Sequence, residues 1–422
     1  MKIAYITQSY PPMISGASLV VKSLADGMAA RGHSALVIAA SDKGPSYTTK
    51  KGCIKTVRLT SLPNPKRAQQ NFVLWSRNAI EDELNQFSPD VLHIHDILSM
   101  GVFGLLTAQR SATPIVSTIH QLPWFISAYL PQLPGLHETI EYSLWEYSRW
   151  LNKQCQVVVV PTRTIAETIQ RQAGFRPKAI SNGIDLCKFR NDELLKSERH
   201  LMYDKYGLTP NCPIILHVGR LDADKRVDIV IRAAAKVLKK TNSQLLVIGD
   251  GELRESLINL TRQLKIHQRS HFPGFVSNSG DLPDIYRLAS VFTTASEIET
   301  QGLVLLEALA SSLPVVAVNA TCIPELVIHK KNGYLVHPGD VEGMAKALTI
   351  LIREPSLAKQ MGRVGRTIVN EHSIDTSLYK QEKIYKELVV QSCERIKPTS
   401  LWNKSQSLFN HLSGFELRRR DR

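Results

Sequence analysis

Short apolar runs alternate with longer segments of helical periodicity along most of the chain. Because these runs are rich in β-branched residues and apolar on both faces, they indicate strands of parallel sheets covered by helices on both sides. In the first half we expect strands at Ile3–Tyr5, Ala35–Ala39, Val91–His95, Ile115–Ile119 and Val157–Val160. In the second half we expect them at Ile214–Val218, Leu245–Ile248, Val291–Thr294 and Val315–Val318. The helical segments between them include Leu19–Ala30, Asp228–Lys239, Leu303–Ala310 and Met344–Ile352.

A polar stretch, Asn191–Asn211, separates the two sets of strands and predicts a domain boundary. The predicted fold class is α/β, with two doubly wound Rossmann-like domains at residues 1–190 and 205–372. A helix at residues 373–392 is expected to pack back on the N-terminal domain, followed by a basic amphipathic tail at 393–422. Ligands of such sheets bind beyond the carboxyl ends of the strands, so the functional cleft is expected between the domains.

The overall composition is that of a globular protein. Hydrophobic residues make up 43% of the chain and charged residues 21%, which excludes collagen-like and fully disordered chains. The sequence holds no apolar run of the roughly 20 residues that span a membrane, and Pro11 and Pro12 come too early for a signal peptide. The six cysteines are widely spaced and include no C-x-x-C pair, so neither a disulfide framework nor a zinc finger is indicated. We expect a cytoplasmic protein.

Net charge adds information about partners. Lys and Arg number 52 against 38 acids, a net charge of +14, which favours an anionic partner such as nucleic acid, an acidic membrane face or a phosphorylated ligand. Residues 43–67 carry basic side chains and no acid. No nucleic-acid-binding motif accompanies this charge, so nucleic acid is not a predicted partner.

The most specific chemical signal is the segment Glu299–Ala308, which holds two glutamates eight positions apart. A strand leads into it and a helix is expected to begin at about Gly302, so the free N–H groups of that helix face the strand ends and form an anion site. Glu299 lies in the loop and Glu307 lies one to two turns into the helix. Two spaced carboxylates can accept hydrogen bonds from a sugar and a ribose. The alternative is a helix that carries an acid in its first turns.

A second signal is the pair Arg220 and Lys225, which leave the end of the strand Ile214–Val218 together. A planar guanidinium and a point-charged ammonium suit the clamping of a diphosphate, whereas the alternative is two solvated cations on a turn. Asp222 and Asp224 match the D-x-D pattern with which one class of sugar transferases holds a metal. Two ligands make a thin motif, so no metal site is predicted.

Glycines mark further turns at strand ends. Gly249 and Gly251 follow the strand Leu245–Ile248 and permit a ligand to approach the backbone, although a plain helix N-terminal turn explains them equally well. Ser15 and Gly16 open the first long helix, where their backbone N–H groups are candidates to reach a phosphate across the cleft.

Histidines end two strands of the first half. His93 and His95 lie on one face of their strand, and without recognisable further ligands we interpret them as core or cleft histidines. His120 ends the next strand and points toward the expected cleft. It is either a hydrogen-bonding catalytic group or a simple strand-end histidine.

Taken in order, SGAS, HIHD, the strand-end His120, SNGID, VGRLDADKRVD, GDGE and ETQGLVLLEALASSLPVV resemble glycosyltransferase family 4. The resemblance runs over about residues 1–390 and implies the GT-B fold, with an acceptor-binding N-terminal domain and a nucleotide-sugar-binding C-terminal domain. It also implies sugar transfer with retention of anomeric configuration. The ETQGL wording is closer to bacterial diacylglycerol glucosyltransferases than to mannosyltransferases.

The same resemblance assigns roles to the candidate residues. Arg220 and Lys225 correspond to the pair that neutralises the donor diphosphate, Glu299 to the acid that contacts the transferred sugar, and Glu307 to the ribose-binding acid. Gly16 corresponds to the glycine of the first loop, and His120 to the histidine beside the reacting sugar. The backbone amides expected beneath the phosphates belong to Gln301, Gly302, Leu303 and Val304. Two departures, Ser15 in place of a glycine and Arg226 after the lysine, leave the base and the sugar open.

An aromatic cluster follows His120, and its members Trp124, Phe125 and Tyr129 are the expected acceptor-binding residues. Beside the basic segment 43–67 they suggest an enzyme that works at a lipid interface, although a buried helix face and a solvated tail would also explain them. We therefore expect transfer of glucose from UDP-glucose to a membrane lipid such as diacylglycerol, at the cytoplasmic face of an anionic membrane. Transfer to a soluble or polysaccharide acceptor is the alternative. No cofactor other than the nucleotide sugar is expected.

The expected mechanism needs no protein nucleophile. Arg220, Lys225 and the helix N-terminus would stabilise the charge that develops on the leaving diphosphate. In the family, the leaving phosphate oxygen removes the acceptor proton on the same face. A nucleotide-sugar epimerase on the same fold is disfavoured, because its strand-end acids and histidines are not recognisable here.

Overall fold

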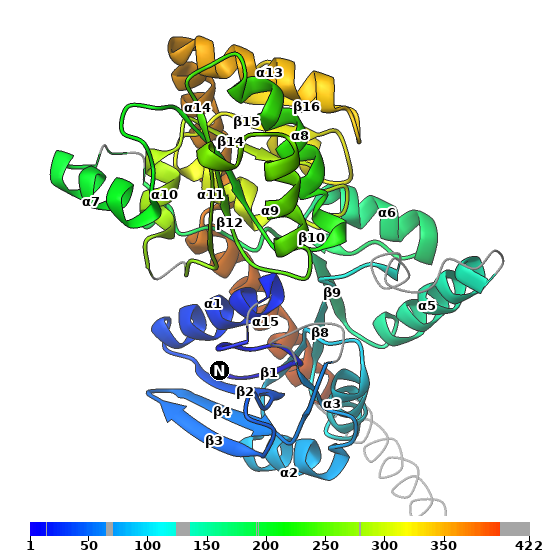
Figure 1. Ribbon diagram of the computed structural model, residues 1–422. Helices are drawn as coiled ribbons and strands as arrows, with labels where there is room; N and C mark the ends of the chain where they lie inside the picture. Colours follow the sequence, from blue (N-terminus) through cyan, green and yellow to red (C-terminus); the bar gives the residue numbers. More distant parts are fainter. Residues whose placement is uncertain are drawn as a thin grey trace, which may run out of the picture.

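The structure is a computed structural model that describes residues 1–13, 15–64, 71–123, 136–190, 192, 194–277 and 280–396. Within this part of the chain, two large sheets each form the centre of an α/β domain (Figure 1). We call the domain built mostly from residues before 190 the first domain, and the other the second domain. The predicted architecture of two doubly wound α/β domains is confirmed.

The sheet of the first domain has eight described strands in the order β10-β9-β8-β7-β1-β2-β4-β3. All are parallel except β3, which pairs antiparallel with β4 at one edge. The strands are β1 (Lys2–Thr7), β2 (Ser34–Ala40), β3 (Tyr47–Lys51), β4 (Ile54–Leu59), β7 (Val91–Ile94), β8 (Ile115–Thr118), β9 (Val157–Val160) and β10 (Lys178–Ala179). The short strands β5 (Leu62–Pro63) and β6 (Asn71–Phe72) pair separately.

Helices cover both faces of this sheet, as the two-sided apolar strands require. On one face, buried residues of α1 (Gly16–Ala30) and α15 (Ile374–Ile396) pack with the strands in one core. On the other face, α2 (Arg77–Phe87) and α3 (Ser99–Arg110) form a second core. Near β9, α5 (Leu136–Asn152) and α6 (Arg163–Ala173) enclose a smaller cluster.

The sheet of the second domain is wholly parallel, in the order β13-β12-β11-β14-β15-β16. Its strands are β11 (Ile214–Val218), β12 (Gln244–Ile248), β13 (Ser270–Gly274), β14 (Val291–Thr294), β15 (Val315–Val318) and β16 (Gly333–Val336). Its helices are α7 (Lys196–Tyr206), α8 (Val227–Leu238), α9 (Arg254–Gln263), α10 (Leu282–Leu288), α11 (Leu303–Ala310), α12 (Ile323–Leu326), α13 (Val341–Arg353) and α14 (Pro355–Val369). Counted within the domain this is the 3-2-1-4-5-6 order of a Rossmann sheet, whose ligand crevice lies where the order reverses, between β11 and β14.

The chain crosses between the domains twice, at neighbouring positions. Ile184 N–H donates to His372 O and Ile374 N–H donates to Ile184 O, both at 2.9 Å, so the two crossings are hydrogen-bonded to each other. After the second crossing, α15 returns to the first domain and packs against α1 and β7 (Figure 1). Glu382 of α15 fixes this contact by accepting hydrogen bonds from Arg31 (3.0 Å) and His33 (3.2 Å).

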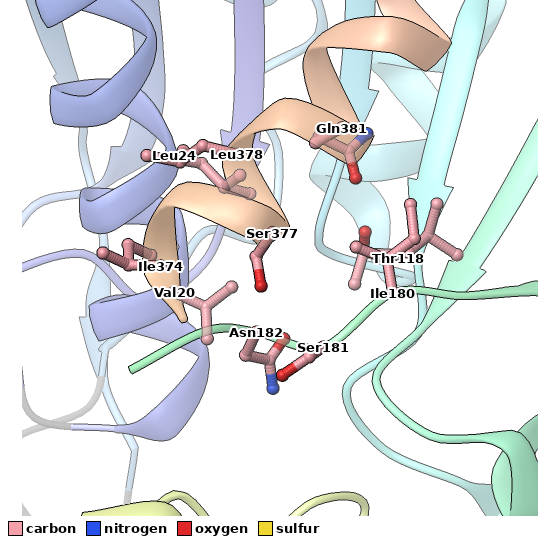
Figure 2. Close-up of a pocket in the computed structure, with 11 residues that line it drawn as sticks. Val20, Leu24, Thr118, Ile180, Ser181, Asn182, Ile374, Ser377, Leu378 and Gln381 are labelled. Atoms are coloured by element: carbon pink, nitrogen blue, oxygen red, sulfur yellow. The ribbon is translucent and has the colours of Figure 1, made fainter. Parts of the chain in front are cut away.

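A small cavity lies beside the crossings. Its walls come from α1, β8, the segment just before the first crossing and the start of α15. Its polar members include Thr118, Ser181, Asn182 and Gln381 (Figure 2). The cavity measures about 20 Å³, which is room for one water molecule.

The described part of the basic segment, residues 43–64, does not form a uniform cationic surface. Residues 47–59 form the hairpin β3–β4, which the sequence analysis did not predict. Arg58 is buried and donates hydrogen bonds to the carbonyls of Tyr10 (3.2 Å) and Ala40 (3.0 Å), so it is not available to an external anion. Lys50 and Lys51 on β3 are exposed. Within the described residues, no helix combines the length and apolar character that crossing a bilayer requires.

Candidate active site

The loops that follow β11 and β14 bring the predicted donor residues together. Arg220 and Lys225 come after β11, and Lys225 closes a short 3₁₀ turn at Ala223–Lys225. Glu299 comes after β14, the next strand across the reversal of strand order. The first domain contacts the second near these loops. A Cβ atom placed on Gly16, at the start of α1, would lie 3.8 Å from the side chain of Leu303, at the start of α11. The candidate site therefore lies at the carboxyl ends of β11 and β14, on the side that faces the first domain.

Lys225 and Glu299 form a shielded ion pair in this crevice. Lys225 Nζ donates to Glu299 Oε1 at 2.6 Å, and both side chains are less than one-fifth exposed. Burial on its own would lower the pKa of Lys225, but the carboxylates of Glu299 and Asp224 outweigh it and raise that pKa. The ammonium is therefore held charged and in place at neutral pH.

Arg220 is held by two carboxylates of its own loop. Its guanidinium pairs with Asp222 and, at 3.0 Å, with Asp224. The D-x-D acids thus act as partners of the predicted phosphate-binding cation. Among the described residues, no group of three or more His, Cys, Asp or Glu side chains is arranged to hold a metal ion. A donor diphosphate that reached Arg220 would compete with Asp222 and Asp224 for its N–H groups.

The helix α11 begins at the predicted place, with Gly302 as its N-cap. Gly302 has φ +74°, the left-handed region that favours glycine, and a Cβ there would lie 2.9 Å from Leu305. No side-chain hydrogen bond caps this N-terminus. The first N–H groups of the helix, at Leu303 and Val304, therefore remain available to an anion in the crevice.

Glu307 lies deeper than Glu299. It is only 5% exposed, and its Oε2 accepts a hydrogen bond from the Tyr286 hydroxyl at 2.8 Å. Burial, together with the charge of Glu307, raises the pKa of Tyr286, so Tyr286 remains a neutral donor. Tyr286 orients the Glu307 carboxylate. The contact of Glu307 with a ribose stays a prediction.

Gly249 and Gly251 serve the loop that carries Arg220. Gly249 has φ +137°, and a Cβ there would lie 1.8 Å from Gly219 O, while a Cβ on Gly251 would lie 2.7 Å from Leu221 O. Leu221 N–H donates to Asp250 O at 2.9 Å. The two glycines thus let one turn pack directly on another. The two glycines are therefore required for packing within the protein. Their contact with a ligand stays a prediction.

The first domain contributes a cluster of three histidines. His120 is half-buried at the end of β8, and its Nε2 lies 2.8 Å from His95 Nδ1. His93 is fully buried and hydrogen-bonds Tyr385 of α15 (2.6 Å) and Thr118 (2.7 Å). Burial lowers the pKa of His93 to about 3 and that of His120 to about 4, so these imidazoles are neutral at pH 7.

The predicted acceptor residues Trp124, Phe125 and Tyr129 lie outside the described residues, as does most of the tail. On the following helix α5, the aromatic residues divide between core and surface. Trp145 is buried, whereas Tyr142 and Trp150 are exposed.

Several contacts between the domains were not predicted. Gln301 Oε1 accepts from Asn182 N–H at 2.9 Å, and its Nε2 donates to Ser181 Oγ at 2.6 Å. Thr162 Oγ1 donates to Thr300 O at 2.9 Å. These bonds hold the loop that carries Glu299 against the first domain.

A carboxylate of the second domain also meets a helix of the first. Glu325 accepts from Arg163 N–H at 3.2 Å and from Thr164 N–H at 2.5 Å, at the N-terminus of α6. Thr162, Arg163 and Thr164, which make these contacts from the first domain, follow the end of β9. Their position after a strand that ends at the cleft is the sequence signal that could have predicted the contacts.

The fold and this crevice define a sugar transferase of the GT-B class, and comparison with known proteins agrees. The model of the family described as "Glycosyltransferase Family 4" matches residues 14–188. The model of the family described as "Glycosyl transferases group 1" matches residues 201–368. The chain belongs to glycosyltransferase family 4 and is an enzyme of the GT-B fold.

Individual relatives cover nearly the whole chain. An uncharacterized glycosyltransferase of Methanocaldococcus jannaschii is 29% identical over 82% of this chain and 87% of its own length. The alpha-monoglucosyldiacylglycerol synthase of Acholeplasma laidlawii is 27% identical over 94% of this chain and 96% of its own. The crystal structure of Anabaena HepE in complex with UDP-glucose has a TM-score of 0.73 at 20% identity, over 92% of this chain and 100% of that one.

Proposed function

We propose that the protein transfers glucose from UDP-glucose to a membrane lipid such as diacylglycerol, with retention of anomeric configuration. The observation that carries the lipid acceptor is the similarity to the alpha-monoglucosyldiacylglycerol synthase, which extends over 94% of this chain rather than over one domain. The choice of UDP-glucose rests on that synthase and on the UDP-glucose complex of a protein with the same fold.

The crevice supplies the groups that such a donor requires. Arg220 and Lys225 lie in the loop after β11, and Lys225 contacts Glu299 in the loop that leads into α11. We assign these two cations and the N-terminus of α11 to the leaving diphosphate. In the reaction the bond from sugar C1 to the phosphate oxygen breaks, and a bond from C1 to the acceptor oxygen forms on the same face. The acceptor proton passes to the leaving phosphate oxygen. Positive charge fixed in advance lowers the barrier because it meets the charge that develops on the diphosphate.

The proposed transfer needs no metal ion. Asp222 and Asp224, which would be the metal ligands of a D-x-D site, are engaged by Arg220 in this structure. Charge on the leaving group is then neutralised by the two cations and the helix N-terminus. Transfer is therefore expected to continue in EDTA.

An exposed apolar patch on the first domain supports a lipid acceptor. Trp75 is 81% exposed and Leu74 66% exposed, on the segment before α2. The Trp75 ring meets Phe103 of α3 edge-on at 5.4 Å, and Ser99 Oγ donates to Val73 O at 2.7 Å. We call these side chains the apolar patch: Leu74, Trp75, Leu98, Phe103 and Leu106.

The patch lies on helices that begin at the edge of the sheet where His120 lies, and two arginines neighbour it. Helices α2 and α3 both begin at the carboxyl edge of the first sheet, the edge at which His120 lies. Arg77 and Arg110 flank the patch and share one carboxylate, that of Glu81. Exposed aromatic and aliphatic groups of this kind favour peripheral attachment to a membrane.

The test compares four donors: UDP-glucose, UDP-galactose, UDP-GlcNAc and GDP-mannose. Each is supplied in EDTA, with diacylglycerol-containing anionic vesicles, with soluble sugar acceptors, or with neither. We expect a new glycolipid from UDP-glucose that requires vesicles. Transfer to a soluble acceptor without vesicles would overturn the lipid acceptor but keep the transferase. A requirement for Mg²⁺ or Mn²⁺ would overturn metal independence.

A further inference from the structure

His95 and His120 share one hydrogen bond at the cleft edge of the first sheet. They follow the ends of the neighbouring strands β7 and β8, and His95 Nδ1 lies 2.8 Å from His120 Nε2. The ring centroids are 5.1 Å apart and the ring planes differ by 20°. This separation fits two nearly coplanar rings joined edge to edge by an in-plane hydrogen bond, rather than two rings stacked face to face.

Both rings are neutral, so the shared bond contains a single proton. His95 is 7% exposed, and burial lowers its pKa well below the usual value, while the pKa of His120 falls to about 4. Two neutral imidazoles can share the bond in two ways. Either His95 Nδ1–H donates to His120 Nε2, or His120 Nε2–H donates to His95 Nδ1.

The other nitrogen of His95 decides between the two arrangements. His95 Nε2 is buried and has no hydrogen-bond partner among the described residues. If His120 were the donor, His95 would carry its proton on Nε2, and that N–H would be buried without an acceptor. Orphaned buried N–H groups are rare because the lost hydrogen bond is not replaced. If His95 is the donor, its proton is used in the bond to His120.

We propose that His95 is a positioning residue that holds His120 as the neutral Nδ1–H tautomer. Because Nε2 of His120 is occupied by His95, Nδ1 is the ring nitrogen that His120 can turn to a substrate in the cleft. In this tautomer Nδ1 donates, so His120 presents a hydrogen-bond donor to a sugar oxygen. The identity of the substrate in this inference rests on the proposed function. The geometry of the His95–His120 pair does not.

The first arm of the test reads the tautomer directly. Protein labelled with ¹⁵N-histidine is measured by long-range ¹H–¹⁵N correlation at pH 7.5, and the His120 signals are assigned with His120→Gln. We expect the proton of His120 on Nδ1 in the wild type and loss of this fixed tautomer in His95→Leu. A protonated Nε2 on His120 in the wild type would overturn the proposal. This arm needs no turnover, so it decides the matter even if the proposed reaction is wrong.

The second arm measures glucose transfer by His95→Leu and His95→Asn. We expect about 10-fold lower kcat for His95→Leu with an unchanged KM for the donor, because the reacting geometry is loosened while the phosphate site is intact. His95→Asn retains a side-chain N–H and should recover most of the loss. His33→Gln is the matched control, since His33 lies on the first domain but pairs with Glu382 rather than with a histidine of the cluster. Full kcat in His95→Leu would overturn the positioning role.

Discussion

Gln301 donates a hydrogen bond from Nε2 to Ser181 Oγ at 2.6 Å, and this bond joins the two domains. Gln301 stands between the loop that carries Glu299 and the cap of α11, whereas Ser181 precedes the first crossing. The donor loop is therefore held by the first domain as well as by its own. Closure of the cleft and the position of Glu299 are coupled through this bond, together with the bond from Thr162 to Thr300.

Replacing Gln301 should weaken catalysis through this coupling. Gln301→Ala removes the bonds to Ser181 and to the Asn182 backbone, and we expect about 10-fold lower kcat/KM for the donor, equivalent to about 1.4 kcal/mol. Ser181→Ala should cost less, because the backbone bond from Asn182 remains. Steady-state kinetics of both variants and of the double variant form a cycle. Additive losses in the double variant would show that the two residues do not act together.

Lys225→Ala should reduce glucose transfer by about 100- to 1,000-fold, because it removes a fixed charge from the leaving diphosphate. The change also leaves the Glu299 carboxylate without its ammonium partner. Lys205→Ala is the matched control: Lys205 also forms an ion pair, with Asp281 at 2.5 Å, but lies on α7 away from the crevice. Retention of full activity by Lys225→Ala would contradict the assigned donor site.

Trp75→Ser should reduce sedimentation with anionic vesicles by about 10-fold or more. The reason is that the variant lacks the indole ring, which would otherwise move from water into the membrane interface. The comparison is Tyr379→Ser on α15, which removes a side chain that is 61% exposed but outside the apolar patch. We expect Tyr379→Ser to sediment like the wild type. Equal sedimentation of the two variants would remove the apolar patch as the membrane contact.

The histidine cluster should make the protein less stable in mild acid. Burial lowers the pKa of His93 to about 3 and of His120 to about 4, whereas an unfolded histidine titrates near 6.5. Below pH 6.5 the unfolded chain takes up protons that the folded chain does not. The free energy of unfolding should therefore fall as the pH falls from about 6.5 to 4, by up to about 1.4 kcal/mol per pH unit for each histidine.

Urea unfolding at pH 7.5, 6.0 and 5.0 measures this dependence. His93→Gln should reduce the slope of unfolding free energy against pH, whatever its effect on stability at pH 7.5. His200→Gln, which removes a histidine whose side chain is 71% exposed, is measured beside it for comparison. Parallel curves for His93→Gln and the wild type would show that His93 is not kept neutral by the fold.

The strands were predictable from the sequence where both faces of the sheet are buried. The predicted bounds of Val157–Val160, Ile214–Val218 and Val291–Thr294 agree with the structure. The hairpin β3–β4 was missed because β3 is an exposed edge strand of threonines and lysines, with no apolar run to mark it. Its basic residues suggested a charged surface, and only the fold shows that Arg58 is buried.

The candidate site was predictable as a set of residue types but not as a set of pairs. Arg220, Lys225 and Glu299 could be placed at strand ends because parallel strands share one carboxyl edge. The pairing of Lys225 with Glu299, 74 positions apart, depends on the course of two loops, and no local pattern fixes it. The same holds for Gln301 with Ser181, which join two domains.

The two crossings between the domains also have a mechanical consequence. Because Ile184 and Ile374 are hydrogen-bonded to each other, the two crossings form one paired connection, which we call the double strap, rather than two independent linkers. A double strap resists shear and separation, but it still bends about the line along which its two members lie. Relative motion of the domains should therefore have one soft direction, which widens or narrows the crevice while the strap and the packing of α15 on the first domain move as a unit.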